Sequence, residues 1–249
     1  MCCFSGPVTA VSATNIFARP STGNRQFIVY SMHLNTRSDV AMILPIPIAP
    51  HSNEQAVKFI NLEKYADFFK DMDKGFPMPQ SRGLGGFKGE PAAGAKTALE
   101  VVAVGSFEAS FVPTIGDFKR LDSRFRLPDK TWDKLPQYHK YGFAVFKLKP
   151  GAKTIHPMAF DFPRADASKL FFPTVHIHDG QVHPKAGFDH SLFCQMAEGG
   201  RSRVMHWMES PQPAASFMDA TKSKGIVDAK SHCYLHKING NYTNEDVWI

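Results

Sequence analysis

The sequence predicts an α+β protein built mainly of antiparallel β-strands with a few helices. Segments of alternating apolar side chains and short apolar runs recur along most of the chain, which is typical of strands. The 18 glycines and 18 prolines are spread through the 249 residues, as turns between short strands require. With 43% hydrophobic and 21% charged residues, the chain can form one large core. We therefore expect a single domain over residues 1–249.

The first third of the chain contains two strand signals and one helix signal. Residues 28–34 alternate as a half-buried strand does, and residues 40–49 form an apolar run whose prolines suit an edge strand. Ser52 and Gln55 then form a capping-box pattern. Apolar residues recur every three or four positions after it, until Gly75 and a following proline. One helix is expected over this stretch.

The rest of the chain is predicted to be mostly strand. Residues 80–95 are rich in glycine and are expected to form an exposed loop. Asp117 is a predicted helix N-cap and Pro128 a helix end, which indicates a small helical insertion near residues 115–140. The other expected strands span residues 99–112, 142–149, 158–162, 170–178, 192–196 and 234–238.

The net charge of +6 arises between residues 82 and 153, which contain 13 Lys or Arg and 7 Asp or Glu. Acidic residues are interspersed among the basic ones, and no recognition helix or RNA-binding aromatic pattern accompanies them. A solvated helical surface is therefore the preferred interpretation, and nucleic acid is not an expected partner.

The sequence also predicts the cellular compartment. No segment reaches the roughly 18 consecutive apolar residues of a membrane span. The start MCCFSGPV lacks the basic region and long apolar stretch of a secretory signal. We expect a cytoplasmic protein without a membrane partner, whose four cysteines stay reduced and available for metal binding or catalysis.

The segment FFPTVHIHDGQVHP, residues 171–184, carries the strongest functional signal. The Asp-Gly dipeptide at 179–180 is typical of a two-residue hairpin turn. In that register His176 lies opposite His183, and His178 shares their face. The three imidazoles could bind Zn, Cu or Fe and leave a position open for a substrate. A longer turn would separate His183 from the others, and a solvated hairpin without metal is the alternative.

Several other residues are candidates for the same site. Cys3 and Cys2 could add thiolate ligands, which would favour copper or zinc. Asp179 or Gln181 could fix an imidazole tautomer through a hydrogen bond. The remaining histidines and cysteines are better explained as buried core residues. They are His190, Cys194, His232, Cys233 and His236.

Cys2 also supports a different hypothesis. If Met1 is removed, the free amine of Cys2 could act as the general base for its own thiol. The opening MCCFSGPVTAVSATNIFAR resembles choloylglycine-type amidohydrolases, N-terminal nucleophile enzymes in which Arg19 would have a counterpart. The aspartate that follows this arginine in that family is missing from ARPSTGN. The resemblance implies a catalytic Cys2.

A second resemblance spans most of residues 1–178. The ordered motifs MCCFSGPV, MILPIPIAP, VGSFEASFVPTIGDFKRLDSRF, YGFAVFKLKPG and HPMAFDFPR precede a strand toward HIHDG. This order resembles a bacterial family of domains of unknown function, many of which are exported, although an export signal is missing here. The resemblance implies one continuous domain and no established reaction.

These observations lead to three functional hypotheses. The leading one is a transition-metal-binding protein with redox or hydrolytic chemistry on a small molecule, using His176, His178, His183 and Cys3. The second is a cysteine amidohydrolase that uses Cys2. The third is a metal-free interaction or structural protein. The sequence does not determine the oligomeric state.

Overall fold

The computed structural model describes residues 2–77, 102–105, 107–123, 126–127, 131–148, 151–177 and 181–249. The predicted Gly-rich loop at residues 80–95 lies outside these ranges, as do His178 and Asp179. The described part consists largely of strands with a few short helices, so the expected β-rich class is confirmed. Most strand pairs are antiparallel, but the pairs β1–β11 and β2–β12 are parallel, so the sheets are mixed.

Seven strands form the larger sheet, in the order β13-β14-β12-β2-β3-β9-β5. The long central strands carry most of the pairing, and β13 and β5 are short pieces at the two margins. The members are β2 (Ala10–Ser21), β3 (Arg25–Thr36), β5 (Lys58–Asn61), β9 (Gly151–Pro163), β12 (Lys185–Cys194), β13 (Met208–Glu209) and β14 (Tyr234–Thr243).

Six strands form the second sheet, in the order β11-β1-β4-β8-β7-β6, and β10 (Phe171–Phe172) pairs with β15 (Val247–Trp248). β4 lies inside this sheet, so its expected edge position was wrong. The prolines remain compatible because β1 pairs only with Met42 and Ile43 of β4, away from Pro45. The members are β1 (Cys2–Phe4), β4 (Val40–Ile46), β6 (Val102–Val104), β7 (Phe107–Val112), β8 (Gly142–Leu148) and β11 (His176–Ile177).

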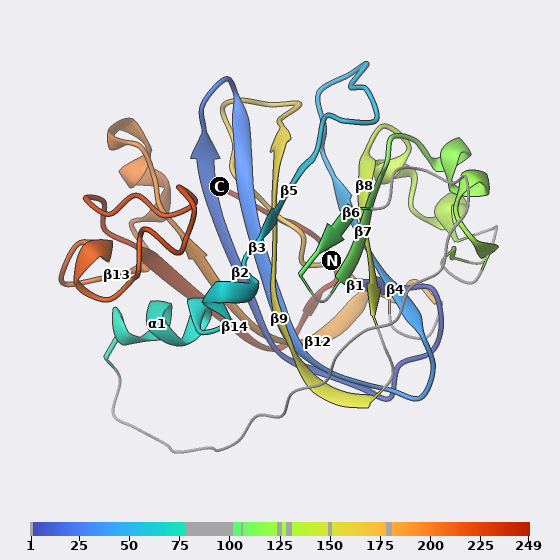
Figure 1. Cartoon of the computed structure of the whole chain (residues 1–249), viewed down its shortest axis with the longest axis horizontal. Helices are drawn as coiled ribbons and strands as arrows, with labels where there is room; N and C mark the ends of the chain where they lie inside the picture. The colour runs from blue at the N-terminus through green and yellow to red at the C-terminus, as the bar shows by residue number, and fades with distance from the viewer. Residues whose placement is uncertain are drawn as a thin grey trace.

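The two sheets pack face to face over the main core (Figure 1). Alternate residues of each strand point into it, for example Tyr30 of β3 and Met42 of β4. Helical segments cover the two outer faces. The helices that pack on the outer face of the seven-stranded sheet include η1 (Glu63–Tyr65), α1 (Phe68–Lys74) and η7 (Ala214–Ser216). A further helix, η6 (Glu198–Val204), connects β12 to β13 in the chain. None of the helices in the described ranges is long and apolar enough to cross a membrane.

The single helix expected from Ser52 to Gly75 was wrong over its first half. Residues 58–61 form β5 instead, because they pair with the otherwise open side of β9. The hydroxyl of Ser52 donates to the carbonyl of Ala49 at 2.6 Å and caps no helix. Only Phe68–Lys74 is α-helical. Pairing with a distant strand therefore outweighed the local helical pattern.

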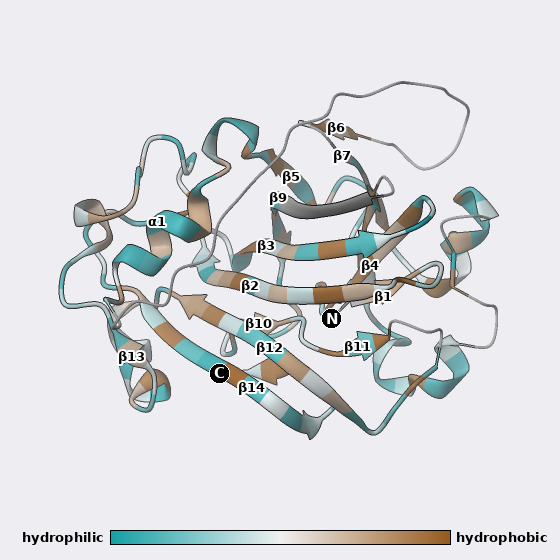
Figure 2. Ribbon diagram, turned by 90° about the horizontal axis from the view of Figure 1, so that it is seen from below, coloured by the Kyte–Doolittle hydropathy of each residue, from teal (hydrophilic) through white to brown (hydrophobic). Residues whose placement is uncertain are grey.

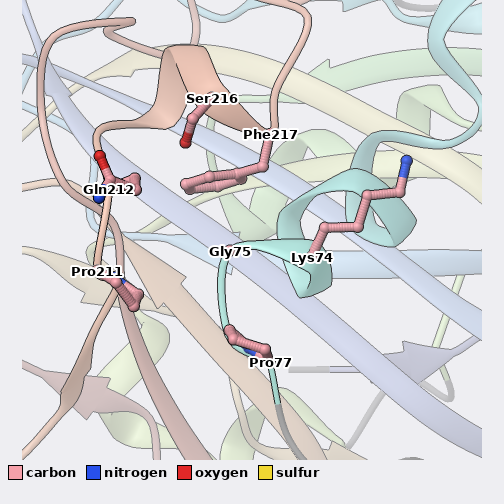
Figure 3. Close-up of a pocket in the computed structure, with 7 residues that line it drawn as sticks. All are labelled: Lys74, Gly75, Pro77, Pro211, Gln212, Ser216 and Phe217. Atoms are coloured by element: carbon pink, nitrogen blue, oxygen red, sulfur yellow. The ribbon is translucent and has the colours of Figure 1, made fainter.

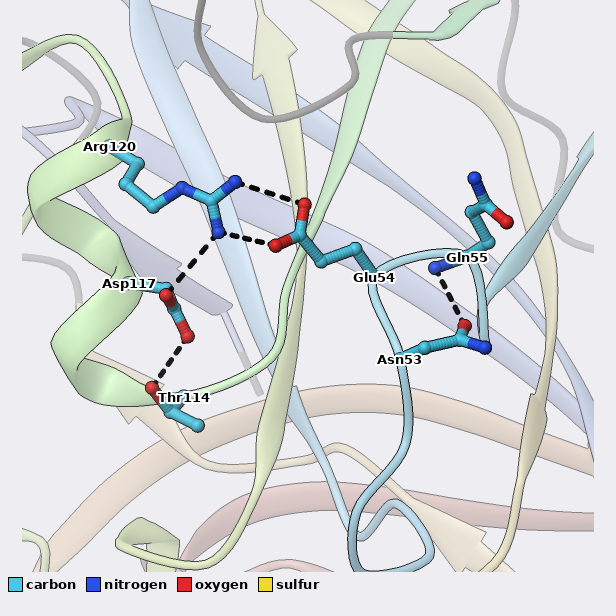
Figure 4. A network of polar contacts seen from close by, with 6 residues as sticks. All are labelled: Asn53, Glu54, Gln55, Thr114, Asp117 and Arg120. Atoms are coloured by element: carbon cyan, nitrogen blue, oxygen red, sulfur yellow. Dashed lines mark hydrogen bonds and ion pairs between the residues drawn. The ribbon is translucent and has the colours of Figure 1, made fainter.

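The segment near residues 115–140 contains the short 3-10 helices η2 (Ile115–Arg120), η4 (Trp132–Lys134) and η5 (Pro136–Tyr138). Asp117 lies inside η2, and Thr114 takes the N-cap position that was expected for it. Arg120 bonds both carboxylate oxygens of Glu54, at 2.5 and 3.0 Å, and also contacts Asp117 (Figure 4). These contacts connect the helical segment to the loop before β5. They also pair the charge of Arg120, which belongs to the basic stretch of residues 82–153, with two carboxylates.

Candidate functional site

The described residues on either side of 178–180 do not form the predicted hairpin ladder, and the turn residues themselves lie outside the described ranges. His176 lies in β11 of the six-stranded sheet, whereas His183 directly precedes β12 of the seven-stranded sheet. β11 pairs instead with Cys2 and Cys3 of β1. The Asp-Gly turn signal is a local pattern, so it cannot predict a strand partner about 170 residues away in the sequence. His183 is exposed, and its backbone carbonyl accepts a hydrogen bond from Asn244 at 3.0 Å. The predicted pairing of His176 with His183 was therefore wrong.

A different pair of imidazoles meets in the structure. The rings of His176 and His190 have centroids 4.8 Å apart and planes inclined by 66°. Both residues are buried, with 9% and 2% of their surfaces exposed. Phe188, two residues before His190 on the same face of β12, lies 4.8 and 5.3 Å from the two rings. This imidazole pair, His176 and His190, joins the two sheets.

Two side chains that follow β14 hold the backbone of residues 174–176 in place. Asn244 accepts from the N–H of His176 at 2.7 Å and donates to its carbonyl at 2.9 Å. Asp246 accepts from the N–H groups of Thr174 and Val175, at 2.8 and 3.1 Å, and from the hydroxyl of Tyr138 at 2.7 Å. The segment after β14 therefore fixes β11 together with its strand partner β1.

The side chain of Cys3 and the backbone of Cys2 are placed by the strand β1. Cys3 is buried in the outer core of the six-stranded sheet with Ile177, whereas His176 faces the other side of β11. Cys3 therefore points away from the imidazole pair, contrary to its expected role. The backbone of Cys2 pairs with that of His176. Among the described residues, no three His, Cys, Asp or Glu side chains are grouped closely enough to hold a metal.

The other candidate residues are dispersed. Cys194 lies in the main core, where burial and the nearby Cys233 raise the pKa of its thiol. Burial raises the pKa of Cys233, on the opposite face of the sheet, to about 12. The Nδ1 atom of His232 is 2.7 Å from a backbone carbonyl. The ring of His236 stacks on Trp207, and burial lowers the pKa of this imidazole. These contacts indicate structural roles.

Clefts on the described surface include one beside Phe188 and one at the end of α1. One, of about 340 Å³, is bounded by Phe188 and so lies next to the imidazole pair. Its other lining residues come from β14 and the segment that follows it, and include Ile238, Tyr242 and Glu245. The other cleft, of about 270 Å³, lies between the end of α1 and residues 211–217 (Figure 3). Phe188 is the residue that this cleft shares with the surroundings of the imidazole pair, and neither His176 nor His190 is among the lining residues described.

Comparisons with known proteins give structural likeness only. No family model matches the chain, and no curated protein matches it. The crystal structure of baculovirus P35 is 15% identical and has a TM-score of 0.47 over 97% of this chain and 96% of that one. A mutated baculovirus P35 after caspase cleavage is 16% identical, with a TM-score of 0.49 over 95% and 99%. P35 in the caspase-8/P35 complex is 13% identical, with a TM-score of 0.46 over 95% of both.

These identities and TM-scores assign neither a family nor a function to the chain. The two family resemblances described from the sequence remain predictions.

Proposed function

We propose that the protein binds a transition-metal ion between His176 and His190. The observation that supports this function best is the approach of two buried imidazoles from different sheets to a centroid distance of 4.8 Å. With metal–nitrogen distances of about 2.0–2.1 Å and a roughly tetrahedral angle, the centroids of two ligating imidazoles lie about 5 Å apart. The observed spacing is therefore compatible with a shared ion after small ring rotations.

The remaining coordination positions need other ligands. Cys2 is the first residue to test, because its backbone pairs with that of His176 and a thiolate would favour zinc or copper. A water molecule or a small-molecule substrate would take another position. A small molecule in the cleft of about 340 Å³ would contact Phe188, whose ring packs against both imidazoles. Asn244 would keep His176 in place throughout by its two hydrogen bonds to the histidine backbone.

Metal titration of chelator-treated protein tests this function. Calorimetry with Zn²⁺ and Cu²⁺ should show one tight site, which is lost in His176→Ala and in His190→Ala. His183→Ala is the matched control, because His183 belongs to the sequence-predicted cluster but is exposed, whereas both members of the imidazole pair are buried. Cys2→Ala should weaken the site if Cys2 is a ligand. Unchanged affinity in a His176→Ala/His190→Ala double variant would refute the proposal.

A further inference from the structure

One side of β14 is open along most of the strand. β14 pairs with β12 along its entire length, from Tyr234 to Thr243. On the other side, β13 pairs only with Tyr234 and Leu235. In the described part of the chain, no further strand pairs with residues 236–243 on that side. Figure 2 shows β14 at the lower margin of the molecule, with β12 as its inner neighbour.

Alternate residues of β14 direct their backbone groups toward this open side. The N–H of Ser210 donates to the carbonyl of Cys233 at 2.8 Å, so the backbone of Cys233 faces the β13 side. The same direction recurs at every second residue of an antiparallel strand. The N–H and C=O groups of the odd-numbered residues 237–243 therefore face outward, as a template for another strand.

Few features protect this edge from pairing. Edge strands are commonly guarded by several charges or by a proline. Residues 236–243 contain no proline, and Lys237 is their only Lys, Arg, Asp or Glu. Tyr242 is 52% exposed and lines the 340 Å³ cleft together with Ile238. An added strand would pair with the backbone and cover these apolar side chains.

We propose that β14 pairs antiparallel with β14 of a second copy of this chain, in a register centred on Gly240. Gly240 is the midpoint of the edge-facing stretch 237–243, so this register uses all of its outward groups. The contact has a two-fold axis, and the same surface of each copy meets itself. It would join the two seven-stranded sheets into one continuous sheet.

The side chains support a second copy as the occupant. In this register Ile238 lies opposite Tyr242 of the other copy, twice by symmetry, and pairs of an aromatic and a β-branched residue stabilise sheets. Gly240 lies opposite itself, where two backbones approach closely and no side chain intervenes. Lys237 lies opposite Thr243, so two lysines do not face each other. The register therefore forms two apolar cross-strand pairs and places no like charges directly opposite each other.

The test is sedimentation equilibrium over a concentration series, with variants chosen for the register. Thr243→Glu would place a carboxylate opposite Lys237 of the other copy at two symmetric positions, and should tighten the dimer about fivefold. Thr243→Lys should weaken it by about the same factor. Asn241→Pro removes an outward N–H while leaving the β12 ladder intact, and should abolish the dimer. Met205→Lys is the control, because Met205 is apolar and 73% exposed but lies outside β14.

The expected result is a wild-type dimer that responds oppositely to the two Thr243 variants and is unaffected by Met205→Lys. Circular dichroism confirms that each variant is folded. A wild-type protein that stays monomeric up to millimolar concentration would overturn the proposal. The same holds if that monomer binds an extended peptide of another protein at this edge. A dimer that is insensitive to Asn241→Pro and to both Thr243 variants would also overturn it, because its interface would lie elsewhere.

Discussion

Replacing Asn244 with alanine should destabilise the strand that presents His176. The amide makes three hydrogen bonds, at 2.7 and 2.9 Å to the backbone of His176 and at 3.0 Å to the carbonyl of His183. A typical bond contributes about 0.5–1.5 kcal/mol net, and a buried group left without its partner costs about 1–3 kcal/mol. The bond to His183 is exposed and contributes least. We expect the free energy of unfolding to fall by about 2–4 kcal/mol.

Urea denaturation measures this loss, and thermal unfolding should show a decrease in Tm of about 2–4 °C for each kcal/mol. Asn241→Ala is the matched control, because Asn241 is an exposed asparagine of β14 and its removal should change stability little. The affinity for Zn²⁺ should also fall in Asn244→Ala, since His176 would no longer be held in place. A stability change below about 0.5 kcal/mol would refute the role assigned to Asn244.

Three further predictions follow from buried contacts. Gln26→Ala should lower the free energy of unfolding, measured by urea denaturation, by about 2–3 kcal/mol. The buried amide of Gln26 bonds both the carbonyl and the N–H of Phe171 in β10, at 2.7 and 3.1 Å. An unchanged free energy of unfolding in this variant would contradict the prediction. The thiol of Cys233, with a pKa raised to about 12, stays protonated in the folded state, so the stability it contributes should be present below about pH 9 and lost as the pH rises to about 12. Cys233→Ala should lose less stability than the wild type between about pH 9 and pH 12. If the stability of the two proteins depends on pH in the same way, the role assigned to the Cys233 thiol is wrong. Gly142→Ala should lower stability by about 1–3 kcal/mol in thermal unfolding, because the added carbon would lie 2.6 Å from the buried Phe111 ring, whereas Gly187→Ala meets open space and should be tolerated.

The sequence predicts the strands of this fold better than their partners. Residues 28–34 and 142–149 correspond to β3 and β8, because alternation and apolar runs are local properties of a strand. The helix expected after Ser52 failed because residues 58–61 pair with β9, about 100 residues later in the chain. Local periodicity contains no information about such a partner.

The candidate site shows the same limit. The segment 171–184 predicts a role for His176, and His190 is buried as the sequence predicts, but the sequence does not predict that the two imidazoles meet. The strand period puts His190 and Phe188 on one face of β12, and this could have been read from the sequence. The sequence does not reveal that β11 pairs with the N-terminal strand, in the other sheet, and so faces that surface. The contribution of Asn244 likewise depends on a contact across 68 residues.

The metal site between the two histidines is tested most directly by anomalous scattering. Crystals grown with Zn²⁺ and measured above the zinc absorption edge should show one strong anomalous peak within about 2.0–2.2 Å of a ring nitrogen of both His176 and His190. The same peak should be missing from crystals of His190→Ala. Anomalous density only at surface residues such as His183, with no ion between His176 and His190 in the folded protein, would contradict the proposed function.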